Sequence, residues 1–301
     1  MNYERYHQQI IKAETLVATE SYEEALTVYD QLFAEYEFVF LRDYKVAAQV
    51  AAYTQNIQLA FDYIGFGVTN GWTLSEIKKH DVLKPLKKAQ QWADLEFNYE
   101  VLREDFTTRI NEPIRRQVEQ MYKKDQKLAL KYYLKPGDQA KESLINDELI
   151  PHTEAQMGDL LEIMNLFGYP GEQLIGNSLW MWTIICHHNS ISPDYQQYDD
   201  IYPKMKSKLL NAVRLGQMNP YDLAIIDEWY ITVKSDSGEK SYGYINPLTS
   251  ADELEKANEL RKQLNLRPVE LRNKLVELQE KTKINFYLAG ETWVEGKILV
   301  Q

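Results

Sequence analysis

The chain has 301 residues, of which 44% are hydrophobic, and a formal net charge of −11. This length fits about two domains, and the hydrophobic content can fill a core in each. Cys186 is the single cysteine, so an internal disulfide and the small disulfide-stapled class of secreted proteins are excluded. An acidic surface is a poor partner for phosphate backbones, so we expect no nucleic-acid binding.

The sequence also favours a cytoplasmic protein that does not enter a membrane. Residues 1–7 do not combine a basic segment with a following apolar stretch, as a secretory signal would. The longest apolar run, residues 179–186, is far shorter than the roughly 20 residues that cross a bilayer. A single cysteine suits a reducing compartment.

A helical hairpin is predicted at the start of the chain, over residues 4–37. Apolar residues recur there at helical spacing on both sides of a polar break at residues 19–24. Ser21, with Glu24 three residues later, has the pattern of a capping box at the start of the second helix.

The hairpin is repeated once. Ala48 and Ala60 are twelve residues apart, as Ala13 and Ala25 are, and the second pair follows the first by 35 residues. This shift is close to the period of about 34 residues in tetratricopeptide (TPR) repeats, where small side chains let two helices approach closely. The sequence therefore predicts a second TPR-like hairpin over residues 41–66.

A domain boundary is predicted near residue 110. Pro113 suits the first turn of a helix that would run from residue 112 to about 134, where Pro136 and Gly137 follow. We therefore expect a TPR-like domain over residues 1–110 and a helical domain over residues 111–301. Further helices are expected at 153–167, 177–188, 202–216, 251–264 and 268–281.

One or two small β-hairpins complete the prediction. Bulky residues alternate over 229–233, turn residues follow at 235–238, and residues 240–245 supply a returning strand. A second hairpin is expected about Glu295 and Gly296. The expected fold class is thus mainly α, with TPR-like hairpins followed by an α-helical domain that carries these hairpins.

Residues 114 to about 290 resemble a bacterial family known as domain of unknown function 6624, which often follows helical repeats. The similarity lies in five segments: 121–126 (Met-Tyr-Lys-Lys-Asp-Gln), 165–170 (Asn-Leu-Phe-Gly-Tyr-Pro), 184–188, 223–227 and 241–245. The resemblance implies a polar set that includes Asp125, Gln126, a histidine and Asp227. The chain departs from the family at Glu228, where the family has arginine, and at Ile245, where the family has glutamine.

The polar set suggests an enzyme, with His188 as general base, Asp227 orienting it, and Asp125 and Tyr242 nearby. Such a site would serve a hydrolase or a transferase acting on a polar substrate. His187 and His188 are adjacent, and adjacent helical side chains point about 100° apart, so we expect no metal site and no cofactor. Cys186 lies among bulky apolar residues and is expected in the core.

The leading hypothesis is a non-enzymatic adaptor that binds a protein or peptide partner. Stacked helical hairpins form a concave groove that holds an extended peptide or a helix. Tyrosine gives rigid contact area at low entropic cost, and the expected contact residues are Tyr22, Tyr29, Tyr53 and Tyr63. A groove filled by the protein's own chain would weaken this hypothesis, and scattered or buried polar residues would remove the enzyme.

Overall fold

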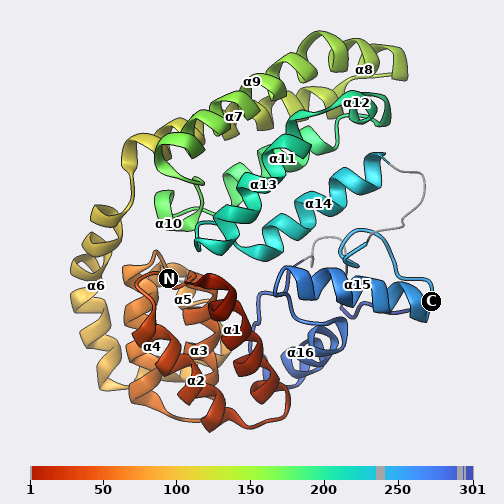
Figure 1. Cartoon of the computed structure of the whole chain (residues 1–301). Coiled ribbons are helices and arrows are strands. Elements are labelled where there is room, and N and C mark those ends of the chain that lie inside the picture. Colours follow the sequence, from red (N-terminus) through yellow and green to blue (C-terminus); the bar gives the residue numbers. More distant parts are fainter. Residues whose placement is uncertain (1, 235–240, 290–293, 295, 301) are drawn as a thin grey trace. The chain divides into compact units, whose positions relative to one another are not determined.

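The structure is a computed structural model that describes residues 2–234, 241–289, 294 and 296–300. It confirms the mainly helical class (Figure 1). The described residues contain no β-sheet, and Leu248 and Val300 form an isolated parallel bridge. The chain divides into two compact units, Met1–Ile110 with Pro247–Gln301, and Asn111–Asn246. The division near residue 110 lies where a boundary is predicted, but the last part of the chain packs with the first unit.

Four helices that pack in two pairs form the first part of unit 1. α1 packs on α2 and α3 packs on α4 (Figure 1). The alanines of the predicted repeat are all fully buried, so they leave room for close helix packing. Asn56 caps α4 by accepting from the Leu59 backbone N–H, whereas Ser21 makes no capping hydrogen bond on α2. The helices are α1 (Tyr3–Ala18), α2 (Tyr22–Glu35), α3 (Leu41–Tyr53) and α4 (Ile57–Thr69).

The rest of unit 1 comes from both ends of the chain. The 3₁₀ helix η1 contacts α3, α6 packs on α4, and α16 packs on α1 although it is far away in sequence. Trp72, between α4 and α5, is fully buried. The elements are α5 (Leu74–Ile77), η1 (Asp81–Lys88), α6 (Gln90–Arg109), α15 (Ala251–Gln263) and α16 (Val269–Thr282).

The segment after α16 contacts α3 through its main chain. The Gln49 side chain accepts from the Asn285 N–H at 2.8 Å and donates to the Asn285 carbonyl at 3.1 Å. Arg42 donates to the Phe286 carbonyl from Nε at 3.1 Å and from Nη2 at 2.9 Å. Ile284, Phe286 and Leu288, at alternate positions of the segment, are 0–3% exposed. The segment is therefore part of the core of unit 1.

Arg42 also belongs to a buried group of charges. Its guanidinium pairs with Glu14 of α1 and, at 2.8 Å, with Asp43. Asp43 accepts from Tyr6 at 2.6 Å, and Arg267 lies 3.1 Å from Glu14. Buried charges are tolerated when each has partners, so these contacts fix α1, α3 and the start of α16 together.

The buried segment should contribute strongly to stability. We expect Phe286→Ala to lower the free energy of unfolding of unit 1 by about 3–5 kcal/mol, because it leaves a cavity in the core. The control Phe97→Ala, whose ring is 87% exposed, should change it by less than about 0.5 kcal/mol. Urea unfolding followed by circular dichroism measures both, and equal small losses would contradict the buried placement.

Unit 2 is built around α11. This helix packs on α7, α9 and α14 (Figure 1). Met181, Ile184 and Ile185 on α11 are fully buried or nearly so. The elements are α7 (Glu112–Leu134), α8 (Asp138–Leu144), the π-helix η2 (Ile145–Leu149), α9 (Ile150–Phe167), α10 (Glu172–Ile175), α11 (Leu179–Asn189), α12 (Pro193–Tyr198), α13 (Ile201–Arg214) and α14 (Pro220–Lys234).

The structure corrects the strand predicted over residues 229–233, which lie in α14. Pro220 starts this helix at the position where proline is tolerated, and a short run of bulky residues fits a strand and a helix equally well by its spacing. Of the returning strand, residue 240 lies outside the described residues and residues 241–245 are not in a strand. Glu295, at the centre of the second predicted hairpin, also lies outside them.

Cys186 is buried, and burial raises the pKa of its thiol well above the usual range. A thiol held in its neutral form is a poor nucleophile. Among the helices of the described residues, none is long and apolar enough to cross a membrane.

Candidate functional sites

The four predicted contact tyrosines of unit 1 have different surroundings. Tyr29 and Tyr63 are 0% and 1% exposed, and the Tyr63 hydroxyl donates to Asp30 at 2.7 Å. They are core residues, so a partner cannot reach them on the folded surface. Tyr53 is 41% exposed, and the half-buried Tyr22 packs edge-on against it with ring centroids 5.5 Å apart. Tyr53 is therefore the accessible member of the set.

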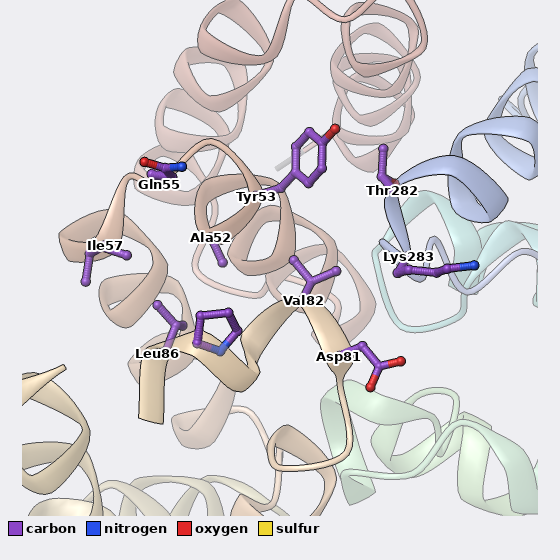
Figure 2. Close-up of a pocket in the computed structure, with 10 residues that line it drawn as sticks. Ala52, Tyr53, Gln55, Ile57, Asp81, Val82, Leu86, Thr282 and Lys283 are labelled. Atoms are coloured by element: carbon purple, nitrogen blue, oxygen red, sulfur yellow. The ribbon is translucent and has the colours of Figure 1, made fainter. Parts of the chain in front are cut away.

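Tyr53 lines an open cavity of about 630 Å³ that lies wholly within unit 1. Figure 2 shows Ile57 and Leu86 at one end and Thr282 and Lys283 at the other. The walls come from the end of α3, the start of α4, η1 and the end of α16. Apolar side chains line most of it: Ala52, Ile57, Val82, Pro85 and Leu86.

Two helix ends shape this cavity. Gln55, just after α3, and Lys283, at the end of α16, both have left-handed backbone with φ near 63° and 65°. At each of these residues the left-handed backbone turns the chain sharply away from the helix end, and both residues line the cavity. Asp81 and Lys283 place opposite charges on the rim, while Lys84 pairs with Asp81. The cavity can accept an apolar side chain while its rim contacts polar backbone groups.

In unit 2, His188 and Asp227 have separate partners. His188 is fully buried, and its Nε2 lies 3.4 Å from Asp199 Oδ1. Within the described part of the chain, Asp227 accepts from hydroxyls and an ammonium group and not from His188. The donors are Tyr202 at 3.0 Å, Lys206 at 2.6 Å and Tyr242 at 3.2 Å. The predicted pairing of His188 with Asp227 is thus absent from these contacts, whereas Tyr242 does meet Asp227.

Asp125 instead pairs with the other histidine. Asp125 Oδ2 lies 2.7 Å from His187 Nδ1, and Gln126 also donates to it at 3.1 Å. Asp125 is 3% exposed, whereas the His187 side chain is 35% exposed. A carboxylate at Nδ1 holds the ring in the tautomer whose Nε2 can accept a proton. This is the geometry of a general base and the residue that orients it.

The choice between the two histidines could have been made from helical phase. Met181, Ile184, Ile185 and His188 follow the spacing i, i+3, i+4 and i+7, which marks one buried face of a helix. His188 therefore belongs to the core face, and His187 lies beside it. The family motif alone does not distinguish the two histidines, whereas this spacing does.

Aromatic and basic side chains lie on the same two helices as this pair. The rings of Tyr122 on α7 and Trp180 on α11 stack with centroids 6.3 Å apart and an angle of 26°. The Arg115 guanidinium lies 4.9 Å from the Trp180 ring centroid. Arg115, Tyr122 and Trp180 are each half-buried, so they form a partly accessible surface on α7 and α11.

Glu228, which replaces the family's arginine, has a structural role. Its fully buried carboxylate accepts from the Ser241 hydroxyl and from the backbone N–H groups of Tyr244, Ile245 and Asn246 at 2.5–3.3 Å. An arginine at position 228 would place its N–H donors against the hydroxyl and backbone N–H donors of residues 241–246. The carboxylate folds residues 241–246 into a loop that brings Tyr242 to Asp227, and burial raises the pKa of the Tyr242 hydroxyl.

Glu228→Gln should therefore destabilise unit 2. The amide keeps the shape of the carboxylate but turns one acceptor into a donor that faces the loop N–H groups. We expect a loss of about 1–3 kcal/mol in the free energy of unfolding. Glu162→Gln, at an exposed position of α9, is the matched control and should be nearly neutral. Thermal unfolding measures both, and equal values would contradict this role of Glu228.

The described residues contain no group of three or more histidine, cysteine, aspartate or glutamate side chains placed to hold a metal ion. Comparisons with protein-family profiles, curated proteins and solved structures found no match for the chain. The resemblance to domain of unknown function 6624 therefore stays a prediction.

Proposed function

We propose that this chain is a non-enzymatic adaptor that binds a protein or peptide partner through the cavity beside Tyr53. The observation that carries the proposal is the cavity itself, which combines an apolar lining, an accessible tyrosine and rim charges of both signs. Its volume of about 630 Å³ falls within the range of ordinary ligand pockets. Tyrosine is enriched at the centres of binding sites, where its ring is desolvated by the partner.

The way unit 1 holds its own chain supports this proposal. Gln49 and Arg42 bind the main chain of residues 285 and 286, and the alternate side chains enter the core. Helical scaffolds that bind extended segments in this way recognise backbone by hydrogen bonds and side chains by pockets. Because residues 284–288 already cover this part of α3, we place the partner at the neighbouring cavity instead of in the groove first expected.

The proposal includes two further predictions from the sequence, that α1–α4 are TPR-like hairpins and that the protein is cytoplasmic. The repeated pairs of buried alanines support a TPR-like origin for α1–α4. The lone, buried Cys186 suits a reducing cytoplasm.

The proposal predicts that binding depends on Tyr53. Selection from a random display library on the full-length chain should yield a class of peptides that bind Tyr53→Ala and Val82→Asp at least tenfold more weakly, as for a hot-spot residue. The control Tyr198→Ala, whose ring is 87% exposed in unit 2, should bind them unchanged. Fluorescence polarisation measures the affinities. The proposed site would be overturned if every selected peptide bound the wild type and both cavity variants equally.

A second candidate function is a hydrolase or transferase, and the specific observation in its favour is the contact between His187 and Asp125. His187 would act as general base, Asp125 would orient it, and Arg115 with the aromatic pair on α7 and α11 would contact a polar or anionic substrate. In this candidate the general base is the accessible His187, whereas the sequence-based hypothesis named the buried His188.

The enzyme candidate predicts turnover that requires both members of the pair. Any hydrolysis of p-nitrophenyl acetate or p-nitrophenyl phosphate by the wild type should fall at least 100-fold in His187→Gln and in Asp125→Asn, since general-base catalysis contributes about that much. His152→Gln should retain it. Turnover that survives in His187→Gln, or no turnover by the wild type, would count against this candidate.

A further inference from the structure

A second groove lies in unit 2, apart from the polar residues discussed above. It has a volume of about 720 Å³ and is formed by α7 on one side and by η2 and the start of α9 on the other. Its lining alternates basic and apolar side chains and includes Lys124, Lys127, Leu128, Leu130, Leu134 and His152.

The shape of the groove follows from the local sequence. Residues 124, 127, 128, 131 and 134 fall on one face of α7 by their helical spacing. The π-helix η2 opposes this face, and wide π turns are frequent at functional sites. Glu148 of η2 pairs with Lys131 of α7, with Lys131 Nζ 2.5 Å from both carboxylate oxygens. This ion pair fixes one end of the groove.

The groove exposes apolar surface that the described residues of unit 2 leave uncovered. Leu130 and Leu134 are 57% and 69% exposed, and the adjoining Tyr133 is 81% exposed. Large apolar side chains that gather on a surface mark an interaction site more often than isolated ones do. His152 Nε2 is a buried atom that has no hydrogen-bond partner among the described residues, and it lies in the same lining.

The charge of the groove is opposite to that of the whole chain. The lining holds Lys124, Lys127 and Lys131 against Glu148, while the chain carries a net charge of −11. Lys131 is neutralised by Glu148, and no ion pair of Lys124 or Lys127 is found with the residues that the structure describes. Two cations therefore flank exposed leucines and are available to an anionic partner.

We propose that this groove binds an acidic, amphipathic segment of a partner protein. The partner's apolar side chains would contact Leu128, Leu130 and Leu134, and its carboxylates would pair with Lys124 and Lys127. Such pairs give specificity and speed association more than they add affinity, and they weaken with salt. This surface is independent of the cavity beside Tyr53.

Two other occupants fit the groove less well. A symmetric dimer through this face would set a lining of three lysines and one glutamate against an identical lining, and the net positive charges would repel. An anionic membrane would attract the lysines, but the surface is concave and Glu148 stands in its wall. An acidic peptide can enter the groove and avoid Glu148.

The test uses the full-length chain and a random peptide display library. Some peptides enriched on the wild type should bind the cavity variant Val82→Asp equally well. These peptides should combine aspartate or glutamate with leucine, isoleucine or phenylalanine. Their affinity should fall at least tenfold in Lys124→Glu/Lys127→Glu and in Leu130→Asp, and it should fall as NaCl rises. Lys256→Glu/Lys262→Glu, which makes the same charge change on exposed residues of α15, should bind them normally.

Three results would overturn the proposal. One is that no acidic peptide is enriched; another is that enriched peptides bind the groove variants as well as they bind the wild type. The third is that no peptide binds the groove, while phosphatidylserine vesicles sediment the wild type but not Lys124→Glu/Lys127→Glu. This result would make the groove a membrane contact. Circular dichroism of each variant confirms that the fold is kept before binding is compared.

Discussion

The guanidinium of Arg42 holds the parts of unit 1 together. It donates to the Phe286 carbonyl and pairs with Glu14 and Asp43, so it connects α1, α3 and a segment more than two hundred residues away. A buried arginine without these partners would carry a large desolvation cost. Glu14 and Asp43 balance its charge, and the C-terminal segment supplies the carbonyl that accepts its remaining N–H groups. Together with the packing of α16 on α1, this contact joins residues 247–301 to the first unit.

This constraint also decides which surfaces are open. The segment 284–288 takes the hydrogen-bonding groups of Gln49 and Arg42 that a partner peptide would otherwise use. Apolar burial of Ile284, Phe286 and Leu288 makes that occupation stable. The cavity beside Tyr53 stays open at the end of the segment, where the left-handed Lys283 turns the chain away from α16.

In unit 2, the polar residues fall into separate groups and not one convergent site. His188 with Asp199 is buried, Asp227 is satisfied by Tyr202, Lys206 and Tyr242, and Glu228 holds a loop. The contacts of Asp227 and Glu228 satisfy buried carboxylates, as a stable core requires, whereas both ring nitrogens of His188 are buried without a hydrogen bond to the described residues. The pair of His187 and Asp125 differs from them because its histidine is partly exposed, which gives the enzyme candidate its one geometric support.

Much of the local structure was determined by the sequence alone. Helical periodicity, the buried alanine pairs and Pro113 predicted α1–α4 and α7 near their observed positions, because a helix depends on contacts between near neighbours. The helical spacing on α11 also indicates which histidine, His188, belongs to the buried face. The five bulky residues of 229–233 were ambiguous, since so short a run has no distinct period, and in the structure they continue α14, which packs on α11 and α12.

Only the tertiary structure decided which faces are open. Tyr29 and Tyr53 are both expected on TPR-like hairpins, yet Tyr29 is fully buried in the core and Tyr53 lines a cavity. The same holds for Asp125, which meets a histidine 62 residues away. Contacts of this kind join segments remote in the chain, and no local pattern of residues records them.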